Sequence, residues 1–138
     1  MKNRKRNVST KLAGVLIVFA AIILATGAWG YERQSNNTNS VRVDVTPVQL
    51  NSGKPVKFEI RLNTHSVDLN FDLSAVALLK DNQGHEYRPT GWNGSPPGGH
   101  HRKGVLEFPA IDSGTKSVTL YLRDIAGVSE RTFEWKTE

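Results

Sequence analysis

Four histidines, His65, His85, His100 and His101, are the residues of this chain whose chemistry suits a metal ion. Imidazole is the commonest side-chain ligand of Zn, Cu and Ni. His65 lies near Asp68, whereas His100 and His101 are adjacent in a stretch rich in Gly and Pro. Because loops at one end of a small β-domain can converge, we take His65, His100 and His101 as the candidate ligands of a divalent transition metal.

The same residues have a simpler interpretation as polar surface or structural histidines. Neighbouring side chains of an extended segment point to opposite faces, so His100 and His101 can share one ion only if the backbone turns there. The chain has no Cys and one Met, which argues against a blue-copper or Cu(I) site. A metal cofactor is therefore the alternative hypothesis, and the primary interpretation includes no cofactor.

Other site chemistry finds little support in the sequence. Asp68, Asn70 and Asp72 match the first ligand positions of a calcium loop, but Leu73 and Leu79 stand where an EF-hand needs Gly and Glu. The chain has no thiol nucleophile and no G-x-S-x-G motif. We therefore expect neither a calcium site of this type nor an enzyme.

Residues 91–104, GWNGSPPGGHHRKG, give the strongest indication of a binding surface. They contain five Gly and two Pro and show no periodicity. A connection of this length is uncommon unless it has a role of its own. We expect Trp92, His100, His101 and Arg102 to contact a ligand, with a core position as the alternative for Trp92.

The elements that must hold this loop are β-strands. Their main signal is the alternation of apolar and polar residues, and no amphipathic helix is predicted. About seven antiparallel strands favour an immunoglobulin-like β-sandwich, with a small β-barrel as the alternative. The predicted strands cover 41–50, 56–63, 67–73, 75–80, 86–92, 105–108, 118–123 and a last segment containing Phe133 and Trp135.

An uncharged apolar stretch, residues 12–30, precedes this domain and is long enough to span a bilayer as one helix. Residues 1–11 contain basic residues and no acid, which predicts a cytoplasmic N-terminus and an extracytoplasmic remainder. A cleaved signal peptide is the alternative, because Ala25-Thr26-Gly27 and Ala28-Trp29-Gly30 loosely fit a cleavage site. The domain is then either anchored in the cell membrane or secreted or periplasmic.

The charge distribution excludes one class of partner. Five of the 18 Lys and Arg lie in residues 1–11, and all 13 Asp and Glu lie beyond them, so the other 13 basic residues are balanced by acids. The net charge of +5 is thus a topology signal, and we expect no nucleic-acid partner. The predicted organisation is a basic segment 1–11, an anchor or signal sequence 12–30, a polar linker 31–40 and a β-domain 41–138.

A longer pattern runs through most of the β-domain. It consists of Thr64-His65-Ser66-Val67-Asp68-Leu69, Thr90-Gly91-Trp92, Pro97-Gly98-Gly99-His100-His101-Arg102, Gly104-Val105-Leu106, Phe108-Pro109, Asp124, Gly127, Phe133 and Trp135. In this pattern the chain resembles a group of small uncharacterised bacterial membrane-anchored extracytoplasmic domains. The resemblance implies a location and a fold, and it implies no activity.

These observations predict a membrane-anchored extracytoplasmic binding or accessory module whose working surface is the 91–104 loop. Its partners are the membrane, through the N-terminal helix, and a protein or small ligand outside the cytoplasm. A metal-binding domain is the alternative function, and an enzyme is the residual one.

Overall fold

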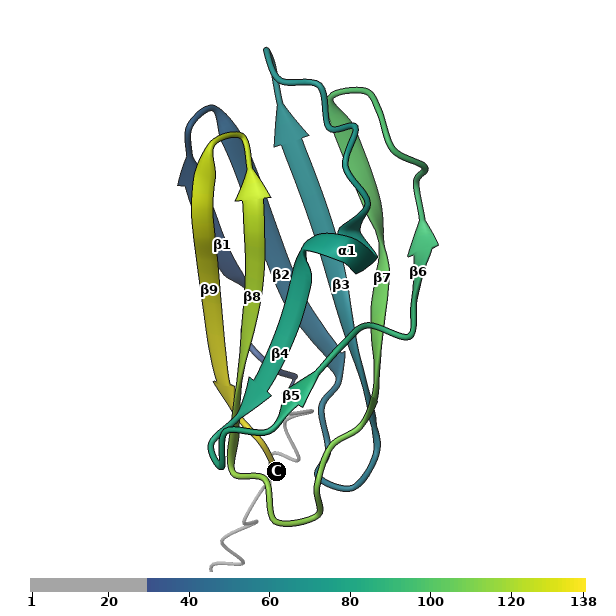
Figure 1. Cartoon of the computed structure of the whole chain (residues 1–138), viewed down its shortest axis with the longest axis vertical. Helices are drawn as coiled ribbons and strands as arrows, with labels where there is room; N and C mark the ends of the chain where they lie inside the picture. The colour runs from purple at the N-terminus through teal and green to yellow at the C-terminus, as the bar shows by residue number, and fades with distance from the viewer. Residues whose placement is uncertain (1–29) are drawn as a thin grey trace, which may run out of the picture.

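Two antiparallel β-sheets packed face to face make up the computed structural model, which describes residues 30–138 (Figure 1). The five-stranded sheet has the order β1-β2-β3-β7-β6, and the four-stranded sheet has the order β5-β4-β8-β9. The all-β prediction is confirmed, with two sheets in place of a closed barrel. The elements are β1 Gln34–Thr38, β2 Val41–Gln49, β3 Pro55–Thr64, α1 Leu73–Val76, β4 Ala77–Asp81, β5 Glu86–Tyr87, β6 Gly91–Gly94, β7 His101–Ala110, β8 Ser117–Ile125 and β9 Val128–Lys136.

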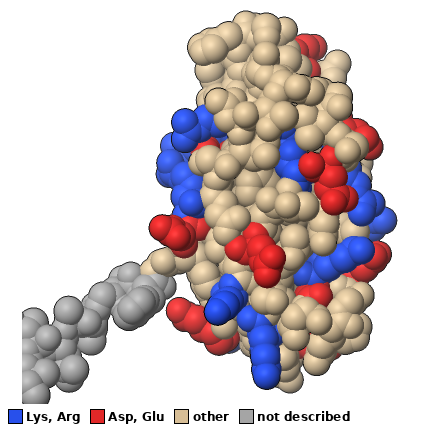
Figure 2. Space-filling view, turned by 90° about the vertical axis from the view of Figure 1, so that its left-hand side faces the viewer, with Lys and Arg blue, Asp and Glu red and all other residues tan. Residues whose placement is uncertain are grey.

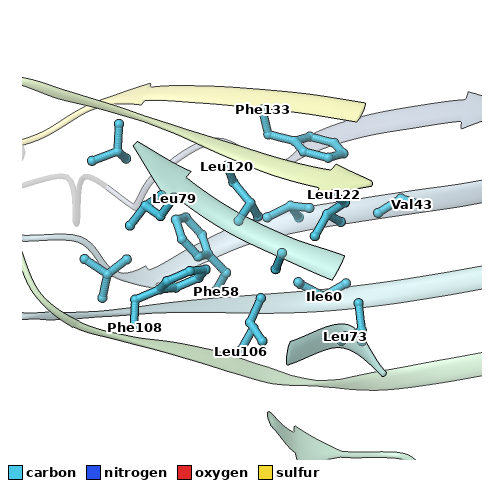
Figure 3. Close-up of a cluster of buried hydrophobic side chains, with 14 of the residues drawn as sticks. Val43, Phe58, Ile60, Leu73, Leu79, Leu106, Phe108, Leu120, Leu122 and Phe133 are labelled. Atoms are coloured by element: carbon cyan, nitrogen blue, oxygen red, sulfur yellow. The ribbon is translucent and has the colours of Figure 1, made fainter. Parts of the chain in front are cut away.

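The hydrophobic core lies between the two sheets and follows from the period-two pattern of the strands (Figure 3). Phe58 of β3 lies in its middle, where its ring meets Phe108 edge-on at 5.9 Å between centroids and Trp135 at 5.2 Å. The apolar residues of β3 face inward and its charged residues face water, as the sequence predicts. The five-stranded sheet therefore has one apolar face in the core and one polar outer face.

The described chain enters the sandwich at the end that also holds the C-terminus, shown at the bottom of Figure 1. The Tyr31 hydroxyl donates to the Leu50 carbonyl and accepts from the Glu138 amide, and the Trp135 indole donates to the Glu32 carbonyl at 2.9 Å. This is the lower end. The opposite, upper end carries the β1–β2 and β8–β9 turns and the segments 65–72 and 95–100.

The predicted anchor, residues 12–30, lies outside the described residues except for Gly30. Within residues 30–138, no helix is both long and apolar enough to cross a bilayer.

The predicted linker 31–40 is wrong, because its middle forms the edge strand β1. Gln34–Thr38 pairs with β2 in register, from Gln34 opposite Val45 to Thr38 opposite Val41. The Gln34 side chain also bonds the backbone of Glu134, donating to its carbonyl and accepting from its amide. A polar segment can therefore form a strand here, since it lies at the edge and bridges to β9.

Three other segments also differ from the predicted strands. The predicted strand 67–73 is a loop up to Asp72 and then enters α1, whose first turn is capped by the Asp72 carboxylate accepting from the Ser74 amide at 2.9 Å. The predicted strand 86–92 is divided into β5 and β6, which belong to different sheets. Strand β7 begins at His101, four residues earlier than the predicted start at Val105.

Replacing a buried aromatic ring should destabilise the sandwich strongly. Phe133 is buried and its ring stacks on Trp135, so Phe133→Ala should cost about 3–5 kcal/mol of a total stability of roughly 5–15. Arg61→Ala, on the polar outer face, is the control and should have little effect. Thermal unfolding followed by circular dichroism checks this, and equal losses in both variants would contradict the assignment of faces.

Candidate functional site

The predicted 91–104 loop is shorter in the structure and is held at both ends by strands. Trp92 in β6 lies opposite Leu106, and His101 at the start of β7 lies opposite Asn63. Only residues 95–100 connect the two strands. The ends of the predicted loop are therefore paired strands, β6 and the start of β7, although their sequence shows no strand periodicity.

Arg102, which the sequence predicts to contact a ligand, is buried inside the sandwich. Its side chain follows the inward-facing positions of β7, and the residue is only 2% exposed. One terminal nitrogen donates to the carbonyls of Leu69 at 3.1 Å and Phe71 at 2.6 Å, and the other reaches the Ser95 carbonyl at 3.4 Å. Burial lowers the pKa of its guanidinium. The bonded carbonyls replace the lost water at the terminal nitrogens, whereas the buried Nε has no partner among the described residues. Arg102 thus holds the 65–72 segment against the end of β6.

Trp92 is half-buried against the core and takes part in the same arrangement. Its indole donates to the Ser95 carbonyl at 2.8 Å. The Arg102 guanidinium lies 5.9 Å from the indole ring and 5.3 Å from the Phe71 ring, a distance at which cation–π attraction operates. Trp92 therefore positions the loop, in line with the core interpretation that the sequence left open.

The space for the indole depends on two glycines that face each other across β6 and β7. A Cβ at Gly104 would lie 2.5 Å from the Gly94 Cα and 2.7 Å from Cζ2 of Trp92, closer than real Cβ contacts. Gly91, on the same strand as Trp92, has open space around it. The glycine content of this stretch is thus partly explained by packing.

We predict that Gly104→Ala lowers the melting temperature by several degrees, because an added methyl group must displace the indole of Trp92 or the β6 backbone. Gly91→Ala is the matched control and should melt as the wild type does. Near-ultraviolet circular dichroism of the tryptophans should change only in the first variant. A Gly104→Ala protein with unchanged melting and spectrum would contradict this account.

The two loops of the upper end are also bonded to each other. The Leu69 amide donates to the Gly99 carbonyl at 3.0 Å, and the Gly98 amide donates to the Leu69 carbonyl at 2.8 Å. The Asp68 carboxylate accepts from the Gly99 amide at 3.1 Å. Asp68 therefore has a structural partner here, and the alternation of Leu69, Phe71 and Leu73 reflects a packed loop and not a strand.

The predicted metal ligands do not form a metal-binding group within residues 30–138. His65 is exposed, and His100 is exposed with its backbone carbonyl accepting from the Thr64 amide. His101 bonds the Asn63 side chain through Nδ1 at 2.9 Å. A different group of three donors, among residues 30–138, has ligand atoms that all lie within 4.8 Å of one another. It consists of Asp81, His85 and Asp112 at the lower end.

This lower cluster was missed from the sequence, which identified residues 81–84 only as a turn. The buried Asp81 carboxylate accepts from the amides of Gln83 and His85, both at 2.9 Å, and from the Tyr87 hydroxyl at 3.1 Å. His85 Nδ1 lies 3.0 Å from a carboxylate oxygen of Asp81 and 3.0 Å from one of Asp112. These three side chains could hold a divalent cation. In the structure they connect the β4–β5 turn to the segment that follows β7, through the contacts of His85 with Asp81 and Asp112.

The lower cluster predicts a loss of stability in acid. Burial by itself raises the pKa of Asp81, but hydrogen bonds from His85, Gln83 and Tyr87 outweigh it, so the pKa is lowered overall. The resulting stabilisation is present above the unfolded-state pKa of about 3.9 and is lost as pH falls through the lower folded-state value. Asp81→Asn should therefore reduce the free energy of unfolding more at pH 7 than at pH 3, because the stabilisation declines once pH falls below about 3.9.

Urea unfolding at the two pH values measures this difference. Asp124→Asn, an exposed change of the same kind, is the control and should leave the pH dependence of stability unaltered. A deficit in Asp81→Asn that is as large in acid as at neutral pH would refute the assignment.

Two adjoining hollows lie on the polar outer face of the five-stranded sheet, toward its upper end. The upper hollow, of about 390 Å³, is lined by Asn37, Ser40, Arg42, Asn63, Thr64, His65 and Ser66. The side hollow, of about 240 Å³, is lined by Arg61, Asn63, Ser95, His101, Arg102 and Lys103. Asn63 belongs to both, and neither hollow is lined by Asp or Glu.

The strand register explains why these side chains meet. Arg42, Asn63 and His101 lie opposite one another across β2, β3 and β7, and Asp44, Arg61 and Lys103 form the next row on the same face. The sequence pattern predicts Arg42, Asp44, Arg61 and Asn63 on the water-facing sides of their strands, whereas His101 and Lys103 fall in the predicted loop. The sequence has no signal for the register that aligns them. Figure 2 shows charged side chains around the middle and lower parts of the sandwich, whereas the upper end in that view is nearly free of them.

The structure thus defines a small two-sheet β-domain with a polar, acid-free pair of hollows on one sheet face. No protein-family model matches the chain. No curated protein matches it significantly, and no solved structure does so either. The resemblance to small bacterial extracytoplasmic domains therefore stays a prediction.

Proposed function

We propose that this protein is a single-pass membrane protein that holds an immunoglobulin-like binding module outside the cytoplasm. The basic segment 1–11 lies inside, the stretch 12–30 is the anchor, and the upper end of the sandwich is the binding surface. Its role is to bind a ligand and not to catalyse a reaction.

The strand order supports the immunoglobulin-like assignment. Immunoglobulin domains place strands A, B, E and D in one sheet and G, F and C in the other, with C′ added beside C in variable-type domains. Here β2-β3-β7-β6 corresponds to A-B-E-D, and β9-β8-β4-β5 corresponds to G-F-C-C′. Strand β1 is an additional edge strand beside β2. Binding loops in this architecture cluster at the ends of the sandwich, as the segments 65–72 and 95–100 do.

The observation that carries the proposal is the separation of the tethered end from the hollows. Tyr31 and Glu32 are bonded at the lower end, so a membrane tether would attach there (Figure 1). The upper hollow includes Ser40, His65 and Ser66 from the turn and loop at the opposite end. A ligand approaching from outside the cell would meet this end first.

The tether geometry can be measured with single cysteines, because the chain has none of its own. Ser66→Cys lies exposed at the upper end and Lys54→Cys lies exposed at the lower end. In intact cells, a membrane-impermeant maleimide should label both variants. In liposomes containing an acceptor lipid, a donor dye at residue 54 should transfer more energy to the membrane than a dye at residue 66.

Asn3→Cys, in the basic segment, is the control and should react only after the cells are lysed. Labelling of residue 66 only after lysis would overturn the orientation. Equal energy transfer from residues 54 and 66 would overturn the display of the upper end. Recovery of a mature chain that begins near Ala28 or Tyr31 would select the cleaved signal peptide over the anchor.

A further inference from the structure

We infer that the two hollows bind an acidic oligosaccharide, a hydroxyl-rich chain of sugar units that carries carboxylate groups. This inference rests on the proposed binding function, since it names the ligand class for the same surface. It depends on the charge of the hollows, on the row of donors across three strands and on the kind of polar groups that line them.

Two arginines of the hollows, Arg42 and Arg61, are oriented by hydrogen bonds that leave their terminal nitrogens available. Arg42 bonds both oxygens of Asp44 through Nε, at 3.0 and 3.1 Å, and Arg61 bonds Glu59 through Nε at 2.9 Å. Within residues 30–138, the terminal nitrogens of these two guanidinium groups have no hydrogen-bond acceptor. A guanidinium presents donors in a planar fork that suits the two oxygens of a carboxylate. Each arginine is therefore oriented by a neighbour and retains donors for an incoming anion.

The lining of the hollows selects against a cation and for an anion. Asp44 is nearly buried and is bonded by Ser35 as well as Arg42, so its charge is compensated within the sheet. These bonds outweigh the effect of burial and lower the pKa of Asp44, so the carboxylate is ionised at neutral pH. Lys103 adds a further cation to the side hollow, where it lies 4.0 Å from the Glu59 carboxylate that Arg61 also bonds, so two cations of this hollow face one acid. Charge complementarity thus favours a ligand with negative groups.

The uncharged lining residues fit hydroxyl groups. Asn37 and Asn63 offer amides, and Ser40 and Ser66 offer hydroxyls, all of which both donate and accept hydrogen bonds. Sugar hydroxyls have the same double capacity. The upper hollow, of about 390 Å³, lies within the range of roughly 300–1,000 Å³ that is usual for ligand sites, and the side hollow, of about 240 Å³, lies below it.

The position of the hollows disfavours an extended peptide. Peptides that bind β-domains by strand addition pair with a free sheet edge. These hollows lie on the face of the sheet, over β2, β3 and β7, whose backbones are paired with one another. A peptide backbone would find no ladder of partners there, whereas a sugar chain needs only the side chains.

The test uses the full-length chain in nanodiscs of zwitterionic lipid and isothermal titration calorimetry. The probes are a hexamer of galacturonic acid and the same hexamer fully methyl-esterified, which keeps the hydroxyls and removes the charge. The acidic hexamer should bind at least about tenfold more tightly, and its affinity should fall as salt rises. Nanodiscs without protein measure the background.

The matched variants are Arg61→Gln and Arg123→Gln. Both arginines are 41% exposed and bond a glutamate through Nε, but Arg61 lines the side hollow and Arg123 lies on the other sheet. Arg61→Gln should weaken binding of the acidic hexamer by about tenfold, and Arg123→Gln should leave it unchanged. Melting curves of both variants show whether the fold is kept. Arg42→Gln is the second variant and should behave as Arg61→Gln does.

The outcomes separate this inference from the proposed function. Equal binding of the acidic and esterified hexamers, lost in Asn63→Ala, would support binding at the hollows and overturn the acidic class. Binding of neither hexamer would overturn the oligosaccharide, while the cysteine measurements still decide the display of the upper end. Binding that is equally strong in Arg61→Gln, Arg42→Gln and the wild type would overturn the site itself.

Discussion

The upper end of the sandwich depends on a buried guanidinium, that of Arg102, bonded to main-chain carbonyls. Burying a charge is costly unless hydrogen bonds replace the lost water. The carbonyls of Leu69, Phe71 and Ser95 supply those bonds, and the rings of Phe71 and Trp92 flank the group. Both loops that frame this end are therefore fixed to one side chain of β7.

A second buried arginine, Arg131, fixes the β1–β2 and β8–β9 turns of the upper end by donating to main-chain carbonyls. Arg131 of β9 is 1% exposed and donates to the carbonyls of Val41, Thr38 and Ile125 and to the Asn36 side chain. Burial lowers the pKa of its guanidinium. It holds the β1–β2 turn, whose Ser40 lines the upper hollow together with Asn37 of β1. The walls of the hollow are thus positioned from inside the sandwich.

The sequence predicts the parts of the fold in which one strand face is apolar. Residues of β3 and β8 alternate cleanly, and their faces are assigned correctly. Strand β1 could not be found in this way, because an edge strand of polar residues has no apolar face. The alternation of Leu69, Phe71 and Leu73 wrongly predicted a strand, because the loop and the start of α1 bury Leu69 and Leu73 and partly bury Phe71.

The candidate site was predicted only in part, for a related reason. Trp92, His101 and Arg102 do lie at the upper end, but their roles depend on register, which brings β7 beside β3. Two of them became positioning residues, and Arg42 and Arg61 joined the surface from strands far away in sequence. Pairing over such separations leaves no local pattern, so composition alone could indicate a binding loop but not its partners.

The side-chain amide of Gln34 affects whether the free edge of β9 can pair with another strand. With the membrane anchor proposed above, copies of the domain would be confined to two dimensions and would meet at high effective concentration. An open strand edge would then invite edge-to-edge pairing and sheet-extended aggregates. Gln34 occupies both backbone groups of Glu134 on the outer edge of β9, so part of that edge offers no continuous row of partners. One side chain thus closes part of the β9 edge to pairing with another strand.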